Sequence, residues 1–97
     1  MKIYTVTAVD KLDLAKAYIR CIGFFTSLNE AIEMVESNCL DIAESGINKY
    51  CIIEEVEEGF YGYAYKKKIY KYNVTADKYE EIERPKEWER ICNFGIG

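Results

Sequence analysis

One segment with helical periodicity, set among segments with strand periodicity, constrains the fold of this chain most. Residues 27–30, SLNE, form a capping box in which the Ser27 hydroxyl accepts a hydrogen bond from the Glu30 amide while the glutamate reaches back. Apolar residues then recur on one helical face, at Leu28, Ala31, Ile32 and Val35. We therefore expect a helix that begins at Leu28, covers a sheet, and ends near Asn38, a suitable left-handed terminator.

Strand patterns surround this helix. Alternating apolar and polar residues, with many β-branched side chains, predict strands at residues 2–9, 17–26, 50–56, about 61–73 and 79–83. The first two can pair as a hairpin, the third is expected to be central, and Pro85 ends the last because proline cannot donate to the ladder. A short helix is predicted at residues 87–92.

The predicted order is β-β-α-β-β-β-α over a single domain, residues 1–97. It predicts an α+β fold in which a meandering antiparallel sheet of about five strands carries its helices on one face. A chain of 97 residues has little spare core, so its stability is expected to be modest and a partner subunit would help.

Charge and hydropathy exclude several classes of partner. The 17 acidic and 13 basic residues give a net charge of -4, which argues against long DNA or RNA as a partner. No apolar run approaches the ~18 residues of a membrane span. The start MKIYTVTAVDKLDL lacks the apolar core of a signal peptide, so we expect a cytoplasmic protein without a membrane partner.

The residues suited to catalysis and metal binding are few. The chain has no histidine, and no two of its four cysteines lie at C-x-x-C spacing, so neither a metal site nor a cofactor is expected. The cysteines are interpreted as small buried hydrophobic residues: Cys21, Cys39, Cys51 and Cys92. Glu54 and Glu55 leave an apolar strand but face apart, so they cannot act as a carboxylate pair. The sequence therefore predicts a protein that is not an enzyme.

Residues 59–72, GFYGYAYKKKIYKY, hold five tyrosines and four lysines and form the candidate ligand site. Tyrosine rings can stack on bases at about 1–3 kcal/mol per base, and lysines can meet phosphates. The candidate ligand-binding residues are Tyr61, Tyr63, Tyr65, Lys66, Lys67, Lys68, Tyr70, Tyr72 and Arg84. On an uninterrupted strand Lys67 points away from Lys66 and Lys68, which favours a pocket between subunits over one within a single chain.

Two alternative interpretations stay open. The tyrosines can simply be good strand formers, and the lysines can protect an edge strand from pairing with other chains.

The C-terminal NFGIG is unusually apolar for a chain end. The candidate oligomer interface therefore comprises Trp88, Ile91, Phe94 and Ile96, with packing into the chain's own core as the alternative.

Several segments carry a resemblance to a known group of proteins. The opening MKIYTVTA, the passage FFTSLNEAIEMVE, the strand YCIIEEVEEG and the ending YKYN…YEEIERP…W…NFGIG resemble short uncharacterised proteins of bacteria and their phages over nearly the whole length. Some small phage proteins of similar size are counter-defence factors, oligomers that sequester cyclic or ADP-ribose-like nucleotide signals. The resemblance implies such a role but assigns no individual binding residue.

The resulting functional expectation is a non-enzymatic, homo-oligomeric protein that sequesters a small anionic nucleotide, in the host cytoplasm if a phage encodes it. The alternative is a protein-interaction module or inhibitor that meets a host protein through its aromatic strand or its apolar C-terminal tail. A third class, an enzyme that cleaves a nucleotide signal, is disfavoured by the absence of histidine.

Overall fold

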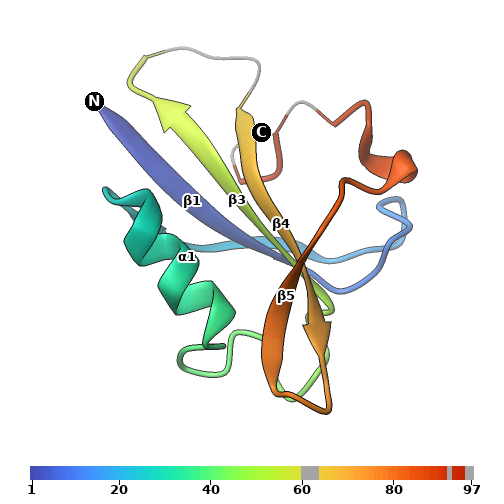
Figure 1. The fold of residues 1–97 in the computed structure, drawn as a ribbon. Helices are drawn as coiled ribbons and strands as arrows, with labels where there is room; N and C mark the ends of the chain where they lie inside the picture. The colour runs from blue at the N-terminus through green and yellow to red at the C-terminus, as the bar shows by residue number, and fades with distance from the viewer. Residues whose placement is uncertain (60–63, 92, 96–97) are drawn as a thin grey trace.

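The fold is an antiparallel sheet with one helix. The computed structural model describes residues 1–59, 64–91 and 93–95. Within them lie the strands β1 (Lys2–Val9), β2 (Ile19–Phe25), β3 (Tyr50–Glu57), β4 (Tyr65–Asn73) and β5 (Lys78–Ile82), the helix α1 (Leu28–Glu36) and a 3-10 turn, η1 (Lys86–Trp88) (Figure 1). The sheet order is β2-β1-β3-β4-β5, so the predicted α+β class and the central position of β3 are confirmed.

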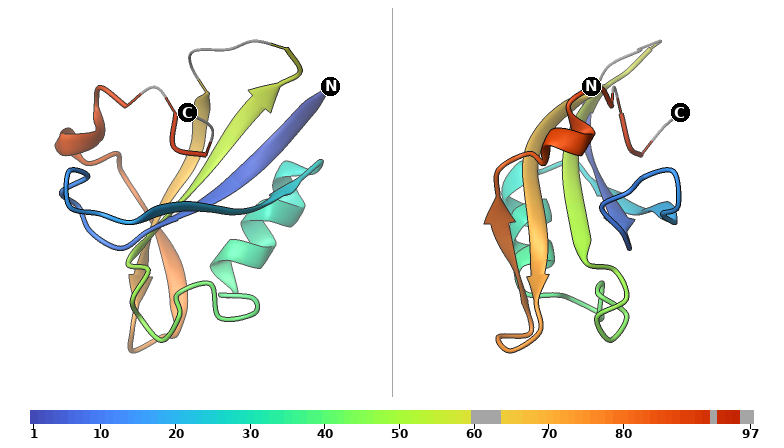
Figure 2. Two further views of the ribbon diagram at one scale, coloured as in Figure 1. Left: turned by 180° about the vertical axis from the view of Figure 1, so that it is seen from behind. Right: turned by 90° about the vertical axis from the view of Figure 1, so that its right-hand side faces the viewer.

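The sheet is not a simple meander. β1 and β2 form the predicted hairpin, but β3 pairs with β1 on the side away from β2. The chain returns from β2 through α1, which lies across the sheet, and so reaches the free side of β1. β2 is consequently one edge of the sheet and β5 the other; in the view from behind, β2 passes in front of the other strands (Figure 2, left).

Helix α1 covers one face of the sheet. The Ser27 hydroxyl accepts a hydrogen bond from the Glu30 amide at 3.3 Å, which confirms the predicted N-cap. Asn38 has φ 50°, the left-handed conformation predicted for the terminator. The apolar stripe of α1 packs into a core cluster that includes Val6, Ala31, Val35, Cys51, Ile53, Tyr70 and Tyr79.

The opposite face carries a second core, made of Val9, Ile52, Ile69, Trp88 and Phe94. These strand residues alternate with those under α1, so they point the other way. The predictions of a helix at 87–92 and of helices on one face only are therefore wrong: η1 is a single turn on the face that α1 leaves bare (Figure 1). Trp88 is fully buried, and its indole N–H donates to the Leu12 carbonyl at 3.0 Å, which fixes the turn to the β1–β2 connection.

A bulge changes the facing of the lysines on β4. Lys66 pairs with Glu54 and Lys68 with Ile53, so Lys67 is the extra residue between two successive partners on β3. The side chains of Lys66 and Lys68 therefore belong to opposite faces, which corrects the expectation for an uninterrupted strand. β4 begins at Tyr65, and the predicted strand residues Tyr61 and Tyr63 lie outside the described residues.

No helix in the described part of the chain has both the length and the apolar character needed to cross a membrane.

Candidate functional site

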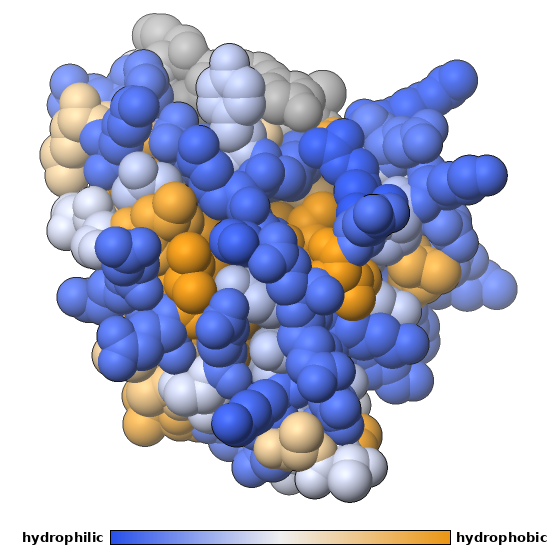
Figure 3. Space-filling view, viewed as in Figure 1, coloured by the Kyte–Doolittle hydropathy of each residue, from blue (hydrophilic) through white to orange (hydrophobic). Residues whose placement is uncertain are grey.

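Exposed apolar side chains gather along the edge strand β2. Nine large hydrophobic side chains are exposed among the described residues, and seven of them lie at this edge or beside it: Met1, Tyr18, Ile19, Ile22, Phe24, Leu40 and Ile47. Figure 3 is viewed as Figure 1, with β2 behind the other strands, and shows on the opposite face several hydrophobic areas separated by hydrophilic side chains. β2 is thus an edge strand that pairs with β1 on one side only, and it is also where the exposed apolar side chains of the described residues are concentrated.

Three surface hollows flank β2. On the α1 side, one of about 480 Å³ is lined by Ile22, Met34 and Leu40 among others, and one of about 330 Å³ by Tyr18, Ile19 and Ile47. A third, of about 410 Å³, is lined by Met1, Ile3 and Phe24. The register places Arg20 opposite Ala8 and Phe24 opposite Thr5, so these two β2 residues face opposite sides of the sheet. The hollows are therefore available to a strand that sends alternate side chains to both faces.

The charged side chains lining the three hollows are mainly acidic. Five carboxylates line them, those of Asp10, Asp41, Glu44, Glu57 and Glu58, against the single guanidinium of Arg20. Arg20 pairs with Glu44 at 2.9 Å, and Glu57 lies 3.7 Å from the Lys2 ammonium. The surface along β2 is consequently apolar with an acidic surround.

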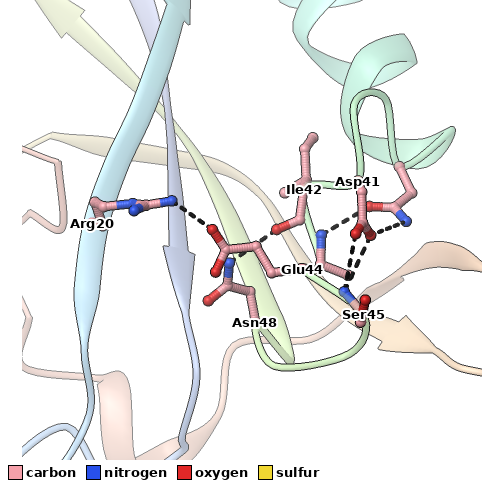
Figure 4. Close-up of polar contacts among 8 residues, drawn as sticks. Arg20, Asp41, Ile42, Glu44, Ser45 and Asn48 are labelled. Carbon is pink, nitrogen blue, oxygen red and sulfur yellow. Dashed lines mark hydrogen bonds and ion pairs between the residues drawn. The ribbon is translucent and has the colours of Figure 1, made fainter.

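The loop between α1 and β3 is built to present side chains beside β2. Its hydrogen bonds include Arg20 to Glu44, the Ser45 amide to Asp41 at 3.1 Å, and Asn48 Nδ2 to the Ile42 carbonyl at 2.9 Å (Figure 4). Five non-glycine residues of this loop are left-handed: Asn38, Leu40, Asp41, Glu44 and Ser45. Each such residue costs of the order of 1–3 kcal/mol, and such strain tends to cluster at functional segments. Leu40 is 98% exposed, so packing within the chain does not compensate its strain.

The lysines of the predicted ligand site are engaged by carboxylates. Lys66 lies 3.3 Å from Glu54, Lys67 lies 3.3 Å from Glu55, and Lys68 lies 3.0 Å from Glu81. These three lysines and Arg84 nevertheless line one hollow of about 230 Å³, together with Glu81. The structure therefore brings the predicted cations together, but with their charge largely neutralised.

The predicted tyrosines do not share one surface. Tyr70 is fully buried under α1 and donates to Glu36 at 3.1 Å, and its burial raises the pKa of its hydroxyl above the usual value. Tyr72 is half-buried and donates to Asp77, a hydrogen bond that raises the pKa of Tyr72 to about 12. Tyr65 is 64% exposed. Tyr61 and Tyr63 are not among the described residues.

The predicted interface residues that the structure describes lie in the chain's own core. Trp88 is fully buried, with its ring centroid 5.1 Å from that of Phe94 and 5.2 Å from that of Tyr50. Ile91 is half-buried against the same cluster. Ile96 lies outside the described residues. The interpretation of Trp88 and Phe94 as core residues, left open by the sequence, is the one that the structure adopts.

Sequence reasoning missed the surface along β2. The segment YIRCIGFFT is apolar on both faces, a pattern that is typical of a buried strand rather than an exposed edge. The expectation that the cysteines are buried is also wrong for Cys21, which is exposed on β2, while Cys51 is buried as expected. Cys92 lies outside the described residues.

Among the residues that the structure describes, no group of three or more histidine, cysteine, aspartate or glutamate side chains could hold a metal ion.

Comparison with known proteins identifies no relative: no protein family matches the chain, and no curated protein or solved structure is significantly similar to it. Function is therefore inferred from the geometry alone.

Proposed function

We propose that this protein is a non-enzymatic protein-interaction module that binds an extended segment of a partner protein along β2. The observation that carries the proposal is the coincidence of an unpaired sheet edge with seven of the nine exposed large hydrophobic side chains. Soluble proteins normally protect such an edge with charged residues, proline, a bulge or a covering element. β2 has a bulge at Ile22, but its only charged residue, Arg20, is already paired with Glu44, and no proline lies in it. An edge left apolar in this way suits strand addition.

The surface also indicates the chemistry of the partner. In strand addition, main-chain hydrogen bonds supply affinity and alternate side chains enter pockets that supply specificity. The hollows beside Ile22 and Phe24 would receive apolar side chains on the two faces of the sheet. Five carboxylates surround them, so a segment with lysine or arginine at its ends would be drawn to this edge. The partner segment is therefore extended, apolar at alternate positions and basic at its flanks.

A second copy of the chain fits this edge less well. Two copies pairing through β2 would bring together two sets of the same five carboxylates, with Arg20 beside Glu44 and Lys2 beside Glu57 in each copy to offset them only in part. Like charges that face one another across an interface suppress association. Homo-oligomerisation through β2 is therefore disfavoured. The experiment below distinguishes it from binding of a foreign segment.

Selection from a displayed library of random ten-residue peptides tests the proposal. We expect the enriched peptides to alternate apolar residues and to carry lysine or arginine at their ends. Phe24→Lys should weaken binding of a selected peptide at least about tenfold, since a buried apolar anchor is typically a hot spot at interfaces. Val74→Lys is the matched control, because Val74 is 76% exposed at the other end of the sheet, in the β4–β5 turn, and should leave the affinity unchanged.

Equal weakening by both lysine variants, or enrichment of acidic peptides, would contradict the proposal. Sedimentation analysis at increasing protein concentration runs beside the selection. A dimer that Phe24→Lys dissociates would identify a second copy, and not a foreign segment, as the occupant of the edge.

A small anionic nucleotide is the second candidate partner. The observation that favours it is the hollow lined by Lys66, Lys67, Lys68 and Arg84, with Tyr65 exposed nearby in sequence. A melting scan against cyclic dinucleotides and ADP-ribose derivatives tests it, because ligand at 100 times its dissociation constant adds about 2.7 kcal/mol of stability. The ligand-induced rise in melting temperature should disappear in Arg84→Ala. A rise that persists in this variant, or no rise with any compound, would exclude this hollow as a nucleotide site.

A further inference from the structure

A buried polar cluster lies under the C-terminal segment, on β1 and β3. The carboxylate of Glu54, which is fully buried on the central strand β3, accepts hydrogen bonds from the backbone amides of Phe94 at 2.9 and 3.1 Å and of Gly95 at 3.0 Å. Two consecutive amides of a bend at Phe94 and Gly95 are thus held by one carboxylate. Hydrogen bonds to main-chain groups are one of the ways in which proteins bind peptide segments.

The side chain of Phe94 occupies an aromatic pocket beside that carboxylate. Its ring centroid is 5.1 Å from that of Trp88, and the Lys66 ammonium lies 5.7 Å from the centre of the same ring. Both distances are within the range of favourable ring–ring and cation–π contacts. The pocket therefore favours an aromatic residue at this position.

The next position is crowded for any residue larger than glycine. A β-carbon at position 95 would lie 3.0 Å from Thr5 Oγ1 and 3.2 Å from both Thr5 Cβ and Thr7 Oγ1, closer than ordinary van der Waals contact. Thr5 and Thr7 are 2% and 0% exposed, and neither hydroxyl has a hydrogen-bond partner among the described residues. Two unpartnered hydroxyls are thus buried under the glycine, where a core residue would normally be satisfied or apolar.

We propose that the groove over Thr5, Thr7 and Glu54 is a recognition site for a Phe-Gly dipeptide at a bend in a protein segment, and that residues 94–95 of the same chain occupy it as an internal ligand. Glu54 binds two free amides, Trp88 and Lys66 contact the aromatic ring, and the two threonines crowd any β-carbon at the next position. A Phe-Gly segment supplied in trans competes with the internal one. The site adjoins β2, because Thr5 is the register partner of Phe24, but it binds a different segment and is tested with a different variant. Failure of one proposal is therefore distinguishable from failure of the other.

The full-length Gly95→Val variant tests the proposal, with Trp88 as the reporter because it is the only tryptophan. Valine places three carbons against Thr5 and Thr7, so we expect Phe94 to leave the pocket and the Trp88 emission to shift to longer wavelength. Addition of the peptide NFGIG, which has the sequence of residues 93–97, should restore the original emission. The matched peptide NFAIG should require at least about tenfold more, because it carries a β-carbon that the threonines crowd.

The unsubstituted chain should respond to NFGIG only at millimolar concentration or above, since its own segment competes at an effective concentration of that order. Unchanged emission of Gly95→Val, or equal binding of the two peptides, would overturn the proposal. If circular dichroism shows that Gly95→Val is unfolded, the unsubstituted chain is titrated with each peptide to ~10 mM by amide NMR. Chemical-shift changes of the Thr5, Thr7 and Glu54 amides with NFGIG but not with NFAIG support the site. The absence of such changes with NFGIG rejects it.

Discussion

The Lys66 ammonium lies 3.3 Å from the Glu54 carboxylate, and the two side chains are 2% and 0% exposed. The pair joins β4 to the central strand β3, and the same carboxylate accepts the amides of Phe94 and Gly95. A buried ion pair is tolerated only where further hydrogen bonds satisfy its atoms, because removing charges from water is costly. Glu54 therefore connects the sheet to the C-terminal segment.

Replacement of Glu54 should be strongly destabilising. Glu54→Gln leaves the Lys66 charge buried without its partner, which typically lowers the free energy of unfolding by about 3–5 kcal/mol. Urea denaturation followed by Trp88 fluorescence measures the change. Glu57→Gln is the control: its carboxylate is exposed and 3.7 Å from Lys2, so a loss of at most ~1 kcal/mol is expected. Similar losses in the two variants would show that the buried Glu54–Lys66 pair contributes no more to stability than the exposed Glu57–Lys2 pair.

Stability should fall at alkaline pH because of Cys51. Burial raises the pKa of the Cys51 thiol from 9.0 to about 12. The unfolded chain releases this proton near pH 9 and the folded chain near pH 12, so the contribution is complete below pH 9 and is lost as the pH rises towards 12. Burial also raises the pKa values of Tyr70 and Tyr79, which adds to the loss in the same direction.

The Cys51 contribution can be isolated by substitution. Above pH 9 the free energy of unfolding should fall less steeply with pH in Cys51→Ala than in the parent. The two slopes should differ by ~1.4 kcal/mol per pH unit. Denaturation curves between pH 8 and 11 measure the slope. Cys21→Ala, at an exposed cysteine, should keep the parental slope. A parental slope in Cys51→Ala would exclude the thiol as the cause.

Leu40→Gly should stabilise the chain while weakening partner binding. Leu40 has φ 56° and is 98% exposed, so glycine removes a left-handed strain and no core contact is lost. A gain of about 0.5–1 kcal/mol is expected in thermal or urea denaturation. Leu40→Ala keeps the strain and should show no gain. If binding of a selected peptide is unaffected by Leu40→Gly, the loop does not belong to the interaction surface.

Removal of the α1 N-cap should cost about 1 kcal/mol. Ser27→Ala leaves the Glu30 amide without its acceptor, and such substitutions typically lower stability by this amount. Ser37→Ala is a comparison at the other end of α1, where the hydroxyl donates to the Met34 carbonyl at 3.2 Å. Urea denaturation should show a smaller change for Ser37→Ala. The reverse order would mean that the capping bond adds little.

Local features were predictable from the sequence because neighbouring residues determine them. The capping serine, the left-handed Asn38 and the approximate bounds of the strands all follow from side-chain chemistry within a few positions. The candidate cations Lys66, Lys67, Lys68 and Arg84 also meet at one hollow, although the sequence did not show that carboxylates would engage the lysines.

Non-local features could not be predicted in this way. The edge position of β2 depends on β3 pairing with β1, a choice made by packing across the whole sheet. The bulge at Lys67 turns Lys66 towards Glu54, and period-2 counting cannot detect a bulge. The position of Glu54 at the end of an apolar run indicates partial burial, but the residue is fully buried because a segment 40 residues later covers it.

The bond between Phe94 and Glu54 also bears on how a cell makes this protein. The Glu54 charge on the central strand is covered by Lys66 and by residues 94–95, so the sheet is incomplete while residues 94–95 are still inside the ribosome. Until then the nascent chain exposes an open, partly apolar sheet to chaperones and proteases. Folding is therefore expected to be completed only after residues 94–95 have left the ribosome, instead of proceeding strand by strand during synthesis.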